Sequence, residues 1–220
     1  LTLTGTGSFA GIIEDGTGTT DLDVDAGAGQ TVGLAGANTF TGGTTVSSGT
    51  LQMTGGTLGD VDAVTGAFDQ DNGAVGAVTN SGGGVTLDGG TASSLTNTTG
   101  IATVTAGQVT GTTTVNGGSV VVNGTDDATG ELQGDTTING TGVLTLTDGN
   151  VGNVINDGTT DGSDNFTMAA GTATSLQNNS GDATLNGGEI TGATDVDGGV
   201  VTNDGATLTG ATTVSAGTFT

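Results

Sequence analysis

The segment Gly111-Thr112-Thr113-Thr114-Val115-Asn116-Gly117-Gly118-Ser119-Val120 contains the pattern that decides the fold. Its Thr-Thr-Val triplet alternates polar and apolar side chains, which is the period of a strand with one buried face. The Asn-Gly-Gly that follows predicts a tight turn, because Gly tolerates positive φ and Asn does so better than most residues. The segment therefore predicts a short strand followed by a turn.

This pattern occurs five times along the chain. The other four copies begin at Gly42, Gly134, Gly192 and Gly210. A longer repeat overlies them, since residues 90–124 match residues 171–205 at about half of their positions without a gap. Internal repeats of this kind are typical of stacked architectures in which each unit contacts its neighbours.

One such unit cannot bury its apolar face alone, so we expect successive units to stack as coils. With roughly 18–20 residues per coil and about 4.8 Å between stacked strands, the chain would form about 11–12 coils and a rod of about 55 Å. The sequence thus predicts an all-β fold, a single parallel β-helix (β-solenoid) over residues 1–220. Both ends lie inside the pattern, so we expect an excerpt or repeating unit of a longer rod, or ends that stack on other copies.

Two other fold classes compete with the solenoid. A β-sandwich also uses many short strands, but it usually carries buried aromatic residues, and this chain has five Phe and no Trp or Tyr. Disorder is suggested by a hydrophobic fraction of 31% and a net charge of −23. The regular spacing of Val, Leu and Ile favours the solenoid over both.

The composition excludes several classes of function. The 220 residues include no Lys, Arg, His or Cys. Ordinary zinc, haem and iron–sulfur sites, and nucleophiles activated by His, therefore cannot be assembled. Without cations the chain cannot neutralise phosphates, so we predict no binding of nucleic acid. No apolar run approaches the roughly 20 residues that a membrane-spanning helix needs.

Residues 34–53 resemble the passenger-associated repeat of bacterial autotransporters, as do residues 208–219. The resemblance is specific over these two segments, and elsewhere it fades to a general solenoid character. It implies a right-handed parallel β-helix carried to the outer surface of a Gram-negative-type cell. In that family the passenger acts as an adhesin, a toxin, a protease or a stalk.

Clustered carboxylates are the candidate metal ligands, because calcium takes oxygen ligands and is plentiful outside cells. None of the clusters has the spacing of an EF-hand or of the nonapeptide calcium repeat. A solvated acidic surface is the alternative. The calcium candidates are Asp157, Asp161 and Asp164 on an irregular stretch, Asp69 and Asp71 before a turn, and Asp21, Asp23 and Asp25, which alternate with apolar residues.

Two further activities are disfavoured. Paired carboxylates can indicate a glycosidase, but such sites need aromatic or basic groups to hold sugars, and Phe alone is available. The Thr-X-Thr triplets at residues 2–4, 103–105 and 145–147 have the form of an ice-binding ladder. They do not recur at one constant coil period, and Thr is a common strand residue in any case.

The sequence therefore predicts a non-enzymatic structural or adhesive segment, a stalk or fibre, in an extracellular or surface-bound bacterial protein. No cofactor is expected apart from calcium, and the pattern allows end-to-end self-association. One alternative is a calcium-dependent self-assembling subunit of a filament or surface layer. Another is the scaffold part of an enzyme or toxin passenger whose active domain lies elsewhere.

Overall fold

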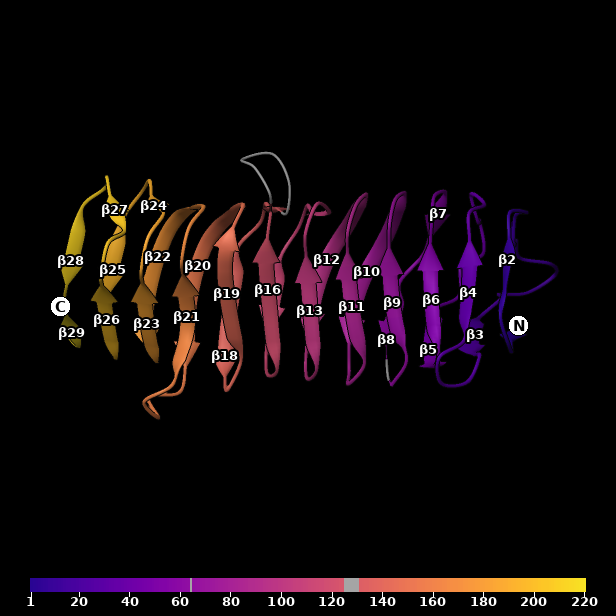
Figure 1. Ribbon diagram of the computed structural model, residues 1–220, viewed down its shortest axis with the longest axis horizontal. Helices are drawn as coiled ribbons and strands as arrows, with labels where there is room; N and C mark the ends of the chain where they lie inside the picture. The colour runs from indigo at the N-terminus through magenta and orange to yellow at the C-terminus, as the bar shows by residue number, and fades with distance from the viewer. Residues whose placement is uncertain (64, 125–130) are drawn as a thin grey trace.

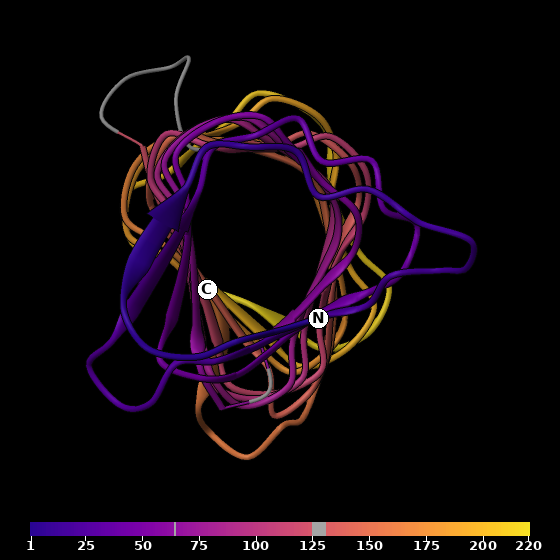
Figure 2. The same cartoon turned by 90° about the vertical axis from the view of Figure 1, so that its right-hand side faces the viewer.

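The computed structural model describes residues 1–63, 65–124 and 131–220, and their regular structure consists of strands. The strands pair in parallel and form two sheets of 17 and 12 strands. Figure 1 shows the coils standing side by side along one axis, and Figure 2 shows that they superpose into one closed outline. The predicted all-β parallel β-solenoid is confirmed.

The smaller sheet, here sheet B, receives one strand from each coil, so its 12 strands correspond to 12 coils. In chain order these strands are β2 (Gly7–Phe9), β4 (Thr31–Leu34), β6 (Thr50–Met53), β9 (Ala67–Gln70), β11 (Gly84–Leu87), β13 (Ile101–Val104), β16 (Ser119–Asn123), β19 (Val143–Asp148), β21 (Asp164–Met168), β23 (Asp182–Leu185), β26 (Val200–Asn203) and β29 (Thr218–Phe219).

The larger sheet, sheet A, receives one or two strands from each coil. Its strands are β1 (Thr2–Leu3), β3 (Leu22–Asp25), β5 (Thr44–Ser48), β7 (Thr57–Leu58), β8 (Val61–Ala63), β10 (Ala74–Asn80), β12 (Thr91–Asn97), β14 (Gln108–Val109), β15 (Thr113–Val115), β17 (Glu131–Leu132), β18 (Thr136–Gly140), β20 (Asn150–Gly158), β22 (Thr172–Ser180), β24 (Glu189–Ile190), β25 (Thr194–Val196), β27 (Thr207–Leu208) and β28 (Thr212–Val214).

The coils differ in length more than the sequence analysis predicted. Phe68 pairs with Val85 in the next coil, whereas Gly7 pairs with Val32, so the step from β2 to β4 is much the longer of the two. Parallel pairing keeps the strands of successive coils aligned, and the extra residues lie in the corners between strands. The spacing between equivalent side chains in the sequence is therefore not constant, although their spacing in the stack is set by the strands.

The core is a single column of aliphatic side chains enclosed by the coils. Strand residues alternate inward and outward, so that Val85 and Leu87 of β11 are buried while Thr86 lies on the surface between them. Phe68 and Phe166 are the largest side chains that are fully buried. Each buried aliphatic or aromatic side chain contributes about 1.5–3 kcal/mol relative to an exposed one, which explains how a thin core supports the stack.

A close approach between neighbouring coils explains why the Gly-X-Thr-Thr-Val pattern begins with glycine. At the corner before β18, a Cβ atom built on Gly134 would lie 2.4 Å from the carbonyl oxygen of Gly111 in the preceding coil. Gly152 stacks on Gly134 in the same way. The backbones of successive coils approach so closely here that no larger residue fits without a shift.

Buried asparagines mark the opposite end of the sheet A strands. The Asn80 side-chain amide donates to Asn97 Oδ1 at 2.8 Å, and that of Asn156 donates to Asn178 Oδ1 at 2.7 Å. All four side chains are fully buried. Their amides donate to one another and to nearby backbone carbonyls, which fixes the register of the corner, while Asn80 Oδ1 is buried without a hydrogen bond.

The long sequence repeat coincides with equivalent strands. β12 begins at Thr91 and β22 at Thr172, and the strands that follow in each copy, β13 to β16 and β23 to β26, begin at the same separation along the chain. Within the described residues, no helix is long and apolar enough to cross a membrane.

Candidate functional site

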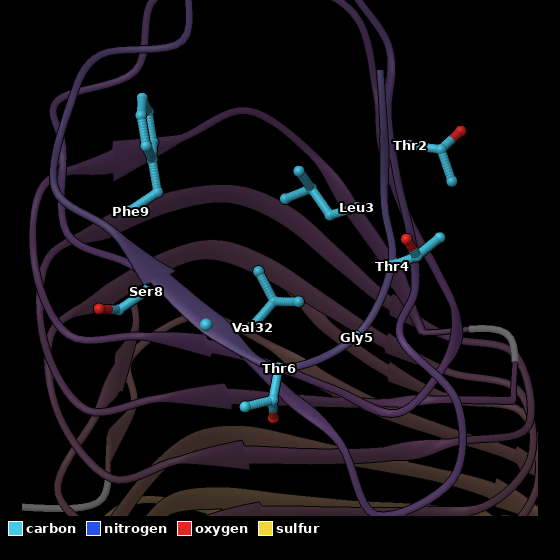
Figure 3. A pocket seen from close by; sticks show the side chains of 9 residues that line it. Thr2, Leu3, Thr4, Gly5, Thr6, Ser8, Phe9 and Val32 are labelled. Carbon is cyan, nitrogen blue, oxygen red and sulfur yellow. The ribbon is translucent and has the colours of Figure 1, made fainter.

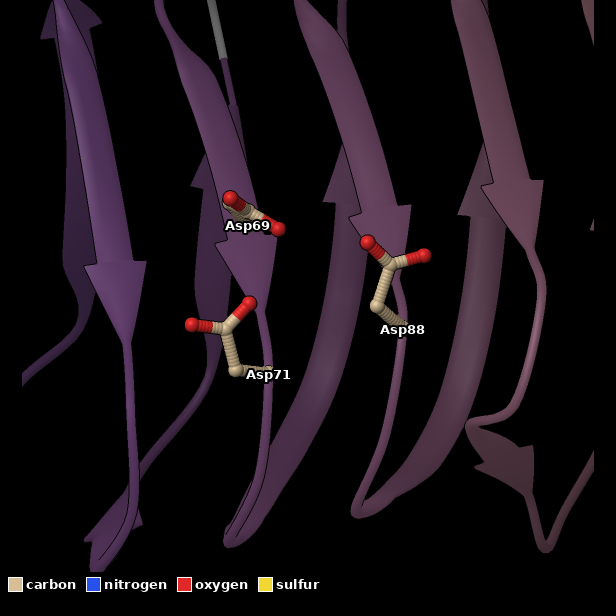
Figure 4. A group of neighbouring side chains, drawn as sticks. All are labelled: Asp69, Asp71 and Asp88. Atoms are coloured by element: carbon tan, nitrogen blue, oxygen red, sulfur yellow. The ribbon is translucent and has the colours of Figure 1, made fainter.

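The best-formed cluster of potential metal ligands in the described part of the chain consists of Asp69, Asp71 and Asp88. One carboxylate oxygen of each lies within 4.8 Å of those of the other two. Figure 4 shows Asp69 and Asp71 on one coil and Asp88 on the next. The arrangement follows from the pairing of β9 with β11, in which Asp69 lies beside Thr86 and Gln70 beside Leu87, so that Asp71 and Asp88 leave the sheet together.

The electrostatics of this Asp69 cluster oppose ionisation of Asp69. Burial raises the pKa of Asp69, and the nearby carboxylates of Asp71 and Asp88 raise that pKa further. Asp69 Oδ1 is shielded from solvent and accepts no hydrogen bond. Asp71 Oδ2 accepts one from the Gln52 side-chain amide at 2.9 Å.

Calcium fits the chemistry of this donor set, since it is bound by carboxylate oxygens and completes its six to eight ligands with water. The sequence had identified Asp69 and Asp71 but not Asp88. A sequence pattern that points to Asp88 is present, because Leu87-Asp88-Gly89-Gly90 follows Gln70-Asp71-Asn72-Gly73 after one short coil. Placing Asp88 beside Asp71 from this pattern requires the length of that coil, which the sequence alone does not fix.

The structure does not bring Asp21, Asp23 and Asp25 together at one point. Leu22 and Val24 are buried between them, as the alternation predicted. Each carboxylate instead accepts a hydrogen bond from the next coil. The donors are the Gly43 amide for Asp21 at 3.2 Å, the Ser47 hydroxyl for Asp23 at 2.7 Å and the Ser48 hydroxyl for Asp25 at 2.6 Å.

Asp157, Asp161 and Asp164 are likewise spread over one coil rather than gathered. Asp157 accepts from the Asn179 side chain at 2.8 Å, and Asp164 accepts from the Thr184 hydroxyl at 2.8 Å. Asp161 accepts from the Ser163 amide at 2.9 Å within its own turn. These carboxylates therefore stabilise turns and neighbouring coils.

A hollow of about 360 Å³ lies at the first coil, lined by residues 2–9 and Val32. Figure 3 shows Leu3, Phe9 and Val32 around its interior, while Thr2 and Ser8 point away from it. Its lining contains Thr, Ser, Gly, Leu, Phe and Val but no titratable side chain. These side chains do not supply a general acid or base.

No protein family, no curated protein and no solved structure matches this chain.

Proposed function

We propose that the protein is a non-enzymatic structural or adhesive segment of an extracellular bacterial surface protein. It would act as a stalk or fibre that extends away from the cell. The resemblance of residues 34–53 and 208–219 to autotransporter passenger repeats supports the location. The missing Lys and Arg would leave trypsin-like proteases no cleavage site, which suits an exposed rod.

One observation carries this proposal: the parallel pairing in sheet B continues without interruption from β2 to β29. Every coil forms backbone hydrogen bonds with its neighbours along the same axis and adds its own buried side chains to the core. Stability in such a stack is close to a sum of coils and their interfaces, so length can be added without a new core. Extension along one axis is what a stalk requires.

The test is to display residues 1–220 on a Gram-negative cell between a barrel anchor and an epitope tag. We expect the epitope to remain accessible to antibody, and the purified chain to appear as single rods of about 55 Å by electron microscopy, given about 4.8 Å per coil. The purified chain should not hydrolyse polysaccharide or peptide substrates. Hydrolysis, or a chain that fails to form rods, would contradict the proposal.

A second candidate is a calcium-dependent subunit of a filament or surface layer. The Asp69 cluster favours it, because three carboxylates from adjacent coils lie together in a chain that has no Lys or Arg. Two carboxylates about 4.8 Å apart repel by roughly 1 kcal/mol in water, and a bound divalent cation would convert that repulsion into attraction between coils.

Electron microscopy with calcium and with chelator separates the two candidates. The rod alone predicts single particles in both conditions, whereas the filament predicts long assemblies that chelator dissolves. Asp88→Asn removes one carboxylate of the cluster, and Asp204→Asn is the matched control in an exposed turn. If filaments formed with calcium, only Asp88→Asn should weaken them.

A further inference from the structure

The turn between β9 and β10 contains the dipeptide Asn72-Gly73, in which the side chain and the following backbone nitrogen are in contact. The Gly73 N–H donates to Oδ1 of Asn72 at 2.7 Å. Since Oδ1 is bonded to Cγ, the Gly73 nitrogen lies no more than about 3.9 Å from the amide carbon Cγ of Asn72. A backbone nitrogen is therefore held beside a side-chain carbonyl carbon that it can attack.

The fold requires glycine at position 73. Gly73 has a φ of 95°, and a Cβ atom built on it would lie 2.5 Å from the carbonyl oxygen of Gly56 in the preceding coil. Residues with side chains are strained at this φ and do not fit the space. The stack thus keeps a residue that leaves its own nitrogen unshielded. Asn before Gly is also an ordinary turn residue, so the contact with the Gly73 nitrogen, rather than the dipeptide itself, identifies the site.

Water reaches both reacting groups. Asn72 is exposed and Gly73 is half-buried. The N–H groups on either side belong to the stack, since that of Ala74 donates to the Gly56 carbonyl at 3.0 Å and that of Asn72 to the preceding coil. Within the described residues, the Gly73 N–H has the Asn72 side chain as its acceptor instead of a carbonyl of a neighbouring coil. This nitrogen can therefore react without breaking a hydrogen bond between coils.

Four other Asn-Gly pairs occur in the described residues without this contact, those at Asn116, Asn123, Asn139 and Asn186. Two of these side chains hold each other, because the Asn139 amide donates to Asn116 Oδ1 at 3.0 Å. Oδ1 of Asn123 accepts from the Thr147 hydroxyl of the next coil at 2.8 Å. The Asn186 side chain is exposed, as that of Asn72 is. It therefore provides a comparison in which the dipeptide and its exposure are the same but the contact is missing.

We propose that Asn72 is a site of spontaneous deamidation. The Gly73 nitrogen gives up its proton to hydroxide and attacks Cγ of Asn72, so that a bond from this nitrogen to Cγ forms and the bond from Cγ to Nδ2 breaks. Nδ2 takes up a proton from water and leaves as ammonia, and a cyclic imide remains. Water then adds to either carbonyl of the imide and opens it, which leaves aspartate or isoaspartate at position 72. Attack within one dipeptide needs no second reactant except water, and proximity favours it.

The reaction adds a negative charge beside the Asp69 cluster. Position 72 directly follows Asp71, and the next coil lies against this turn, since a Cβ atom built on Gly89 would be 2.2 Å from the Asp71 carbonyl oxygen. Figure 4 shows the Asp71 and Asp88 side chains of these two neighbouring coils. The chain has a net charge of −23 and no Lys or Arg to offset a further carboxylate. Repulsion between like charges should therefore weaken the contact between these coils.

The isoaspartate product has a further effect on the stack, because it adds a methylene group to the backbone of the turn. On one side of that turn the Ala74 N–H donates to the Gly56 carbonyl at 3.0 Å. On the other side the Gly73 carbonyl accepts from the Thr91 N–H at 2.9 Å. The extra length should disturb both bonds, so deamidation would age a rod that stays outside the cell for long. The inference rests on the proposed function only for this setting, because the reaction is measured on the purified chain.

The experiment follows all five Asn-Gly pairs by mass spectrometry of peptides while the purified chain is incubated in mildly alkaline buffer. Pepsin produces the peptides, because the chain has no Lys or Arg for trypsin. In the folded chain we expect the deamidated fraction at Asn72 to exceed that at Asn186 severalfold, and to exceed the other three as well. In urea all five should react at similar rates, because the residue after each Asn is the same. Equal rates at Asn72 and Asn186 in the folded chain, or reaction of Asn72 in urea alone, would overturn the proposal.

Variants test the assignment independently of the peptides. Asn72→Ser keeps a turn residue and should abolish most of the early gain in negative charge on ion exchange, whereas Asn186→Ser is the matched control and should keep it. Asn72→Asp copies one product, and at low salt it should melt at a lower temperature than Asn72→Ser, with a smaller difference at high salt. An equal gain in charge in the two Ser variants would overturn the proposed site, and equal melting temperatures would overturn the predicted loss of stability. The proposed stalk would survive either result.

Discussion

Replacement of Asn178 by Ala should destabilise the solenoid by about 3 kcal/mol, because two short hydrogen bonds in the core are lost. Asn178 is fully buried, accepts from the Asn156 amide at 2.7 Å and donates to the Gly198 carbonyl at 2.7 Å. A longer bond reaches the Gly181 carbonyl at 3.2 Å. Loss of the two short bonds, one from a fully buried amide and one to a partly buried carbonyl, costs about 1.5 kcal/mol apiece.

Two variants separate hydrogen bonding from packing. Asn178→Val keeps a branched side chain and copies Val196, which occupies the same inward position one coil later. It should remain almost as unstable as Asn178→Ala, because the amide and the carbonyl still lack partners. Asn186→Ala removes an exposed side chain in a turn and should stay within about 0.5 kcal/mol of the parent.

The assay is urea unfolding followed by circular dichroism, with amide hydrogen exchange to locate the opening. Exchange is needed because a solenoid opens coil by coil, and a single midpoint averages over the stack. We expect amides near Asn178 and Gly198 to exchange faster than those near Asn80. Parent-like stability of Asn178→Ala, or full recovery in Asn178→Val, would refute the hydrogen-bond reasoning.

Three other changes test the stack and the Asp69 cluster. Gly134→Ala places a Cβ 2.4 Å from a carbonyl oxygen of the preceding coil and should lower the urea midpoint, whereas Gly43→Ala, with nothing within 4 Å, should not. The pKa of Asp69 is raised in the folded state, so its ionised form opposes folding, and lowering the pH through that pKa should relieve the penalty. Asp69→Asn should therefore raise the melting temperature at neutral pH in chelator, and this gain should shrink in acid; a gain that grew in acid would reverse the assigned sign. Calcium should raise the melting temperature of the parent but not of Asp88→Asn. If calcium did not change the melting temperature of the parent, the Asp69 cluster would not be a calcium site.

The fold could be predicted from the sequence because a repeated local pattern leaves few arrangements. Thr-Thr-Val followed by Asn-Gly-Gly at residues 113–118 fixes a short strand and a turn, and the turn glycine Gly118 has a φ of 63°. Strands this short bury their apolar side chains only by stacking. The predicted coil number followed from the chain length and an average coil length, and the errors in individual coils nearly cancel over the stack.

The outer faces could not be predicted in the same way. A face is assembled from residues on different coils, so each error in coil length displaces every later member. Asp88 was missed beside Asp71 for this reason, and Thr103 was not aligned with Thr145. The buried asparagines were missed for another reason, since an Asn two or three residues before a Gly is equally typical of an exposed turn.

The outer faces of the two sheets have similar chemistry, which suits a mechanical rod. A stalk needs strand-forming residues on its surface and enough charge for solubility, and carboxylates on either sheet would supply that charge equally. Asp69 lies beside Thr86 and Asp164 beside Asp182 on sheet B, and the outer row of sheet A includes Asp23, Asp62 and Asp195. Thr fills many of the other outward positions of both sheets, as its strand propensity predicts. This distribution of Thr and Asp over both faces is what the proposed stalk requires.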